Sequence, residues 1–246
     1  MTQHASSDLS LPAQFDLTLL ANFVHQVVNP LNGVAGTLDN LANGTIEGAD
    51  RQEQRLHAAR AQLEQCITLM RNLAFLAQGA GGVADQDRRT VVLPQAIIES
   101  AMFFQEEGKT RKIDISLLDR KTQNRVTGHP ELIRQVLMNI LDNCIKYGKF
   151  NSVIEINQWI QSSSDFALIT IKGHSRIPLS SDEISKIFEP GYRGVNARQV
   201  VASGTGLGLY ICKEIIERHH SGRLTVQSEG KDGILFTIRL PHGQKG

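Results

Sequence analysis

The stretch "GTGLGLYICKEI", residues 204–215, joins three closely spaced glycines to an apolar segment with helical spacing. Glycines at such a junction let backbone N–H groups approach an anion, and the start of a helix adds a favourable partial charge. The pattern therefore predicts a phosphate-binding segment. A flexible loop in front of a helix would have the same spacing, so a second motif is needed to decide between them.

The second motif is "VLMNILDNCIKYG", residues 136–148. Asn139 and Asn143 are four residues apart and share one face of the predicted helix, and apolar residues occupy the opposite face. Two amides on one face can ligate Mg²⁺ or contact phosphates, while Lys146 adds a cation and Tyr147 an aromatic surface. A polar helix face in water would look similar if this motif stood alone.

A third motif, "FVHQVVNPLNG" at residues 23–33, places His25 on a predicted helix. Two long segments show apolar residues at alternating spacings of four and three, which is typical of helical bundles. The turn "NGTIEGAD", residues 43–50, separates the two segments. Their apolar positions are Leu20, Val24, Val27, Leu31, Val34, Leu38 and Leu41, then Leu56, Ala59, Leu63, Cys66, Met70, Leu73 and Ala77.

A hairpin with one apolar seam on each helix cannot bury both seams well by itself. Pairing two hairpins gives a four-helix bundle, so the sequence predicts a homodimer. A monomeric hairpin that packs on the C-terminal domain is the alternative. After a polar linker, strands and helices interleave and several neighbouring strands are joined as hairpins. This pattern predicts an α/β sandwich, a mixed sheet with helices on one face.

Together these segments resemble the catalytic core of the sensor histidine kinases of two-component signalling. "HQVVNPLNG" is similar to the phosphoacceptor box of that family, and "NILDNCIKYG" to its asparagine box. "IFEPGYRG", residues 187–194, is similar to its phenylalanine box, and "GTGLGL" to its second glycine box. The four motifs occur in the order of the family. The resemblance extends over about residues 15–241 and implies a Bergerat-type fold for the α/β part.

The resemblance implies a role for each matching residue. His25 would be the phosphoacceptor, and Asn29, one turn later, would orient a water for phosphatase activity. Asn143 would ligate Mg²⁺ with Asn139 nearby. The remaining positions would contact ATP or form the hinge of a lid over its phosphates: Lys146, Tyr147, Gly204, Thr205, Gly206 and Gly208.

Two departures from the family pattern concern the chemistry. Gln26 stands where an acid usually follows the phosphoacceptor, and an amide can orient the imidazole but cannot take its proton. In the first glycine box, the aspartate that accepts a hydrogen bond from the adenine amino group is missing. Its position falls on Lys172, Gly173 or His174, depending on the register. Loss of such a charge-assisted bond costs about 1.5–3 kcal/mol.

The predicted organisation is a tail at 1–14, the dimerisation and histidine-phosphotransfer hairpin at 15–79, a linker at 80–87, the ATPase domain at 88–241 and a tail at 242–246. The predicted function is that of a protein-histidine kinase, a transferase in signal transduction. It would phosphorylate His25 with Mg²⁺ and ATP and pass the phosphate to an aspartate of a response-regulator receiver domain. The alternative is a phosphotransfer protein or pseudokinase scaffold that keeps this fold without using ATP.

Composition limits the other functions. The net charge of +1 gives no sign of a nucleic-acid or membrane-surface role. The three cysteines show neither metal-ligand spacing nor an even count for disulfides. We see no signal peptide and no apolar stretch long enough to span a bilayer, and therefore expect a cytoplasmic protein without membrane insertion. With no sensor domain before the hairpin, a separate sensor protein is a candidate partner.

Overall fold

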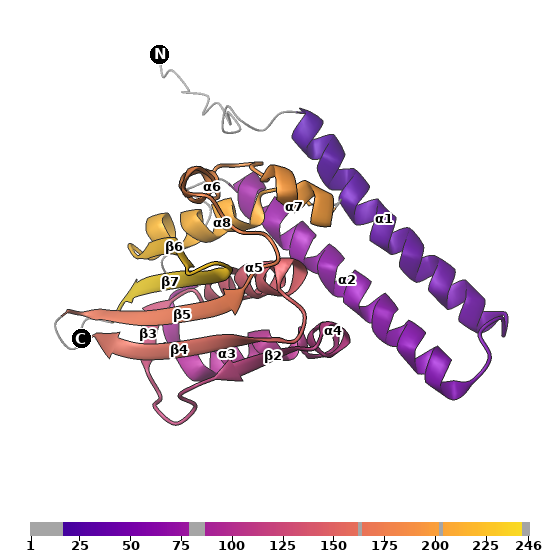
Figure 1. Cartoon of the computed structure of the whole chain (residues 1–246), viewed down its shortest axis with the longest axis horizontal. Coiled ribbons are helices and arrows are strands. Elements are labelled where there is room, and N and C mark those ends of the chain that lie inside the picture. Colours follow the sequence, from indigo (N-terminus) through magenta and orange to yellow (C-terminus); the bar gives the residue numbers. More distant parts are fainter. Residues whose placement is uncertain (1–16, 79–86, 162–163, 202–203, 243–246) are drawn as a thin grey trace, which may run out of the picture.

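A helical hairpin lies beside an α/β domain in the computed structural model (Figure 1), which describes residues 17–78, 87–161, 164–201 and 204–242. The hairpin consists of α1 (Leu17–Ala42) and α2 (Ala49–Gln78). The hairpin followed by a mixed sheet with helices confirms the predicted fold class. The predicted N-terminal tail and most of the predicted linker and C-terminal tail lie outside the described residues.

The hairpin buries only alternate members of the predicted apolar seams. Val34, Ala59 and Cys66 are buried between the helices, and the Cys66 thiol lies 3.6 Å from the carbonyl oxygen of Val27. The seam positions between them are 41–59% exposed: Val24, Leu31, Leu38, Leu56, Leu63 and Met70. Half of each seam therefore closes the hairpin, and the other half forms an apolar stripe on its surface.

Five strands form the main sheet in the order β2-β4-β5-β7-β6. The β2–β4 pair is parallel and the other pairs are antiparallel, so the sheet is mixed as predicted. The strands are β2 (Ile113–Leu117), β4 (Ser152–Gln161), β5 (Phe166–His174), β6 (Arg223–Glu229) and β7 (Gly233–Pro241). A second, two-stranded sheet pairs β1 (Arg89–Val92) with β3 (Arg125–Gly128), a strand that the sequence reading did not predict.

The long helix α5 (Pro130–Tyr147) supplies most of the helical side of the core, because a continuous face of it is apolar. Ile140, Leu141 and Ile145 are fully buried and belong to one apolar cluster with the inward residues of β4 and β5. The other helices of this domain are α3 (Leu93–Met102), α4 (Gln105–Arg111), α6 (Ser181–Lys186), α7 (Val195–Val200) and α8 (Gly208–Glu214).

Helix α8 continues directly into a π-helical turn, η2 (Ile215–His219), after which His220 is buried beside the start of α5. The ring Nε2 of His220 accepts a hydrogen bond from the backbone N–H of His129 at 3.0 Å. The proton is therefore on Nδ1, which donates to the carbonyl oxygen of Ile215 at 2.9 Å. Burial lowers the pKa of His220 to about 4, although the bond to Ile215 acts in the opposite direction.

His220 should make the stability of the protein fall with acidity. The unfolded chain takes up the proton near the ordinary pKa of 6.5 and the folded chain only near 4, so the unfolded state binds more protons between these values. We expect His220 to remove about 2 kcal/mol from the unfolding free energy between about pH 7 and pH 5. Urea unfolding at the two pH values measures this loss. The variant His220→Gln should lose that part of the pH dependence, whereas His57→Gln, at an exposed histidine of α2, should keep it.

Candidate functional site

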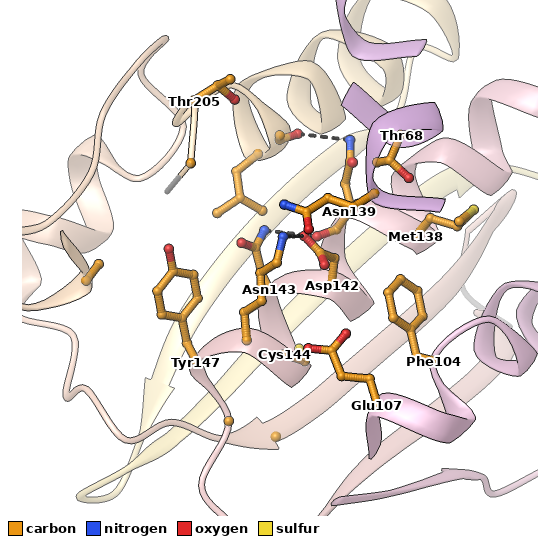
Figure 2. Close-up of a pocket in the computed structure, with 18 of the residues that line it drawn as sticks. Thr68, Phe104, Glu107, Met138, Asn139, Asp142, Asn143, Cys144, Tyr147 and Thr205 are labelled. Atoms are coloured by element: carbon orange, nitrogen blue, oxygen red, sulfur yellow. Dashed lines mark hydrogen bonds and ion pairs between the residues drawn. The ribbon is translucent and has the colours of Figure 1, made fainter. Parts of the chain in front are cut away.

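A cavity of about 610 Å³ lies between α2 of the hairpin and the α/β domain. Its walls come from α2, α4, α5, the end of β5 and residues 204–208, and Figure 2 shows side chains of α5 projecting into it. The structure brings together eight residues that the sequence predicts to bind the nucleotide: Asn139, Asn143, Lys146, Tyr147, Gly204, Thr205, Gly206 and Gly208.

The predicted catalytic residues of the hairpin are placed differently. Gln26 is half-buried and lines the same cavity, whereas His25 and Asn29 are exposed on α1. Neither His25 nor Asn29 belongs to the described residues that line the cavity. The structure therefore brings together the residues that are predicted to bind the nucleotide and leaves His25, the predicted phosphoacceptor, outside the cavity.

The two asparagines of α5 have different environments. The side-chain Nδ2 of Asn143 donates to the backbone oxygen of Asn139 at 2.9 Å, which leaves the Asn143 side-chain oxygen available to a ligand in the cavity. Asn139 is only 4% exposed, and its amide bonds with Asn72 of α2 and with the carbonyl oxygen of Gly208. Asn143 is thus the more accessible of the pair.

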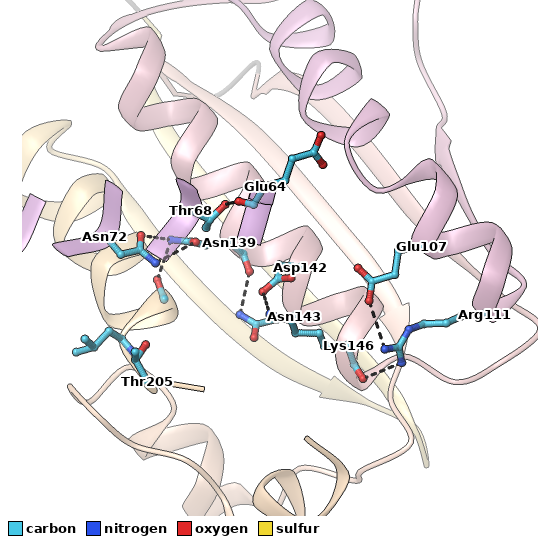
Figure 3. A network of polar contacts seen from close by, with 12 residues as sticks. Glu64, Thr68, Asn72, Glu107, Arg111, Asn139, Asp142, Asn143, Lys146 and Thr205 are labelled. Carbon is cyan, nitrogen blue, oxygen red and sulfur yellow. Dashed lines mark hydrogen bonds and ion pairs between the residues drawn. The ribbon is translucent and has the colours of Figure 1, made fainter. Parts of the chain in front are cut away.

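Two carboxylates lie close to the charged side chain of Lys146 (Figure 3). Its Nζ lies 2.7 Å from Oδ2 of Asp142, one turn earlier on α5, and Glu107 of α4 is also close. Burial lowers the pKa of Lys146, but the two carboxylates outweigh burial and the net shift is upward. Burial and the charge of Asp142 raise the pKa of Glu107, against the effect of its ion pair with Arg111. Lys146 is therefore held as a charged, partly buried cation at the cavity wall.

The glycine segment is fixed by backbone geometry that only glycine accommodates. Gly206 has φ +68°, and a Cβ there would lie 2.6 Å from the carbonyl carbon of Gly191. The carbonyl oxygen of Gly206 accepts a hydrogen bond from the N–H of Gly191 at 3.1 Å, and the Thr205 hydroxyl oxygen accepts one from the N–H of Leu207 at 3.2 Å. The segment is therefore packed against residues 191–193 in this structure.

The segment at residues 172–176, which replaces the expected acidic motif, is built into the fold. The backbone N–H of Ser175 donates to the carbonyl oxygen of Asp232 at 2.7 Å, and the His174 ring lies 3.3 Å from the Asp232 carboxylate. The Arg176 guanidinium donates to the carbonyl oxygen of Lys146 at the end of α5 at 2.6 Å. A Cβ on Gly173, which lines the cavity, would have Ile154 as its only near neighbour at 3.8 Å. Residues 172–176 contain neither aspartate nor glutamate, so this segment offers no carboxylate to the cavity.

The residues of the cavity wall that the sequence analysis did not assign to the site include Asn72, Glu107 and Arg193. Arg193 lies inside the motif "IFEPGYRG", so its neighbourhood carried a signal, and its guanidinium donates to the carbonyl oxygen of Gly204 at 3.3 Å. Asn72 interrupts the apolar end of α2, a position where a buried amide needs a partner. Glu107 had no sequence signal, because it reaches the site only through the packing of α4 on α5.

Comparison with known proteins gives consistent matches. Residues 128–244 match the family of histidine kinase-, DNA gyrase B- and HSP90-like ATPases. The chain is similar to the sensor histidine kinase ZraS of Salmonella typhimurium, with 29% identity over 91% of this chain and 45% of that protein. It is also similar to the sensor protein KdpD of Clostridium acetobutylicum, with 26% identity over 91% of this chain and 24% of that protein. The chain thus spans less than half the length of these relatives.

Among solved structures, the catalytic domain of histidine kinase ThkA superposes with a TM-score of 0.55 and 26% identity. The match covers 63% of this chain and 95% of that domain. A longer form of ThkA, solved in complex with the response regulator protein TrrA, matches 92% of this chain and 62% of that one, with a TM-score of 0.58 and 20% identity. The second match extends the shared fold to the hairpin.

Within the residues that the structure describes, no helix combines the length and the apolar character needed to cross a membrane.

Gly206 should be intolerant of any side chain. The variant Gly206→Ala adds both the cost of a left-handed backbone, about 1–2 kcal/mol, and a clash with the backbone of Gly191. We expect amide hydrogen exchange at the Gly191 N–H to accelerate at least about tenfold. Gly230→Ala is the matched control, because Gly230 has a similar φ of +63° with nothing within 4 Å of an added Cβ. Equal exchange at Gly191 in both variants would contradict this account of the segment.

Proposed function

We propose that this chain, which is similar to the catalytic cores of histidine kinases, transfers the γ-phosphoryl group of ATP to His25 and then to an aspartate of a receiver domain. The observation that carries the proposal is the cavity in which the asparagine helix α5, Lys146 and the glycine segment meet. These elements come from distant parts of the chain, and amides, a cation and backbone groups suit a triphosphate.

The proposed step is an in-line displacement. A ring nitrogen of His25 forms a bond to the γ-phosphorus as the bond from that phosphorus to the β–γ bridging oxygen breaks, and ADP leaves. Gln26 cannot act as the base, so the imidazole proton passes to water. Gln26 lines the cavity and adjoins the exposed His25 in the sequence, and its amide would orient the ring in the reacting complex.

Residues of α5 and of the segment 204–208 would bind different parts of the nucleotide. Asn143 would hold Mg²⁺ through its side-chain oxygen, since its Nδ2 is already bonded to the helix backbone. Mg²⁺ supplies neutralisation of the phosphate charge. Lys146 keeps a positive charge at the wall, and Tyr147 offers a ring face to the base. The segment at 204–208 contributes backbone N–H groups to the phosphates.

The absent carboxylate at residues 172–176 favours a second candidate function. A chain that receives its phosphate from another protein would need His25 and the hairpin but no adenine recognition. The open space beside Gly173 is consistent with that function or with weaker base selectivity. Labelling of the chain with ATP distinguishes the two functions, because only a kinase takes its phosphate from ATP.

We further propose that the hairpin dimerises and that a receiver domain docks beside His25 in the cytoplasm. The support for the dimer is the stripe of six exposed seam residues on α1 and α2, which one hairpin leaves in water. The support for the receiver is the exposed position of His25, which a second domain can reach.

The phosphoacceptor assignment predicts the outcome of labelling with γ-³²P-ATP and Mg²⁺. The wild-type chain should gain an acid-labile, alkali-stable label, and His25→Gln should reduce the label to background. His242→Gln should label like the wild type, because His242 is a described histidine that does not line the cavity. Asn143→Ala should label at least about tenfold more slowly. An unlabelled wild-type chain would contradict the kinase and favour the scaffold.

The dimer proposal predicts that a charge on the apolar stripe separates the subunits. Leu38 is 51% exposed in the single hairpin, and in a bundle its side chain would be buried against the partner. We expect Leu38→Lys to shift the mass measured by light scattering from dimer to monomer at micromolar concentration. Asn40→Lys, at an exposed polar neighbour, should remain dimeric. A monomeric wild-type chain would contradict the proposal.

A further inference from the structure

The C-terminal half of α2 docks on the α/β domain through a surface that is mainly apolar. Phe75 is buried there and makes an edge-to-face contact with the His219 ring, 5.4 Å between centroids. Leu69, Leu73 and Leu76 pack against the same core. Within this apolar contact lies a cluster of three amides, which we call the amide cluster: Asn72, Gln135 and Asn139. Their exposed fractions are 4%, 6% and 4%.

The members of the amide cluster satisfy one another (Figure 3). Oδ1 of Asn72 accepts hydrogen bonds from Nε2 of Gln135 at 2.8 Å and from Nδ2 of Asn139 at 3.2 Å. In return, Nδ2 of Asn72 donates to Oδ1 of Asn139 at 3.5 Å. The Asn72 amide thus faces the Asn139 amide with oxygen against nitrogen on both sides.

Asn139 connects the hairpin to the glycine segment. Its Nδ2 also donates to the carbonyl oxygen of Gly208, at 3.4 Å, where α8 begins. The nitrogen of this amide is therefore shared between α2 and Gly208, and its oxygen is engaged by α2. In this arrangement Asn139 lines the cavity, but both polar atoms of its side chain are engaged by protein partners.

We expect this contact to have two discrete states, docked and separated, for a physical reason. Buried amides are satisfied only when the hairpin is docked, and any partial displacement leaves them unpaired at a cost of about 1–3 kcal/mol each. Full separation exposes them to water, which satisfies them again. The docked state also leaves His25 outside the cavity, so the α/β domain has to leave this position before its nucleotide can reach His25 of the same chain.

We propose that Asn72 is a positioning residue that couples the hairpin to the nucleotide site. By bonding to Asn139, it holds the α/β domain in the docked arrangement and keeps the Asn139 amide on the hairpin and Gly208. Release of this contact frees Asn139 for the nucleotide, and nucleotide binding in turn weakens docking, because coupling between two equilibria is reciprocal. The proposal deepens the proposed function and rests on it for the identity of the ligand.

Calorimetric titration of the full chain with Mg²⁺ and ADP tests the coupling without turnover. We expect Asn72→Ala and Asn72→Ser to bind ADP about fivefold or more tightly than the wild type. The serine variant keeps a hydrogen-bonding group at position 72, so it can be tested if the alanine variant does not fold. Arg71→Gln, at the exposed neighbour on α2, should bind like the wild type. Unchanged or weaker binding in both Asn72 variants overturns the proposal, since a purely structural residue would give that result.

A distance measurement tests the docking itself without a nucleotide. Spin labels at Asn40→Cys on α1 and Glu155→Cys on β4 report the position of the hairpin, and both sites are exposed. The three native cysteines are buried, so labelling is selective. The labelled chain is diluted into excess unlabelled chain, so that only distances within one subunit are measured. We expect one narrow distance in the wild type and a broader distribution in Asn72→Ala or after addition of ADP. A distribution that stays narrow in Asn72→Ala overturns the proposal. If no variant binds ADP, the proposed kinase fails, and the distance comparison still decides the role of Asn72 in docking.

Discussion

Helix α5 has to satisfy two environments at once, and the rest of the structure is arranged around it. One face is apolar and fully buried, with Ile140, Leu141 and Ile145 in the core of the α/β domain. The opposite face carries Gln135, Asn139 and Asn143 toward the hairpin and the cavity. Because core packing fixes the rotation of the helix, it also fixes which amides face the site. The sheet thereby determines the geometry of the proposed nucleotide site, although it contributes few polar groups to that site.

The carbonyl end of the same helix explains how the fold keeps its shape without the expected acidic motif. Arg111 and Arg176 both donate to the carbonyl oxygen of Lys146, at 3.4 and 2.6 Å, where an α-helix leaves its last carbonyls unpaired. Arg176 also lies over the Phe150 ring, 5.2 Å from its centroid. The segment at residues 172–176 has no carboxylate, and its arginine caps the carbonyl end of α5.

Periodicity revealed most of the fold but not its long-range pairs. The spacing of Asn139 and Asn143 sets their common face, and the four-three spacing in α1 and α2 sets the hairpin, because both depend only on helix geometry. The sequence did not show which seam residues are buried between α1 and α2 and which are exposed on the hairpin, because an apolar residue suits either position. The pairing of Asn72 with Asn139 spans 67 positions, and the short strand β3 depends on pairing with β1. Neither has a local signal.

The apolar seam and the amide cluster lie on different sides of α2. Ala59, Leu63, Cys66 and Met70 lie within about 60° of one another around the helix. Ala59 and Cys66 are buried, and Leu63 and Met70 belong to the exposed stripe. Asn72, on the other side, binds the α/β domain. A rotation of α2 by a fraction of a turn moves both sides together. Apolar contacts within the hairpin adapt to such a rotation by repacking, whereas the paired amides of Asn72 and Asn139 require one register. A signal that rotates α2 would therefore act first on the polar contact, which is the contact that adjoins the nucleotide site.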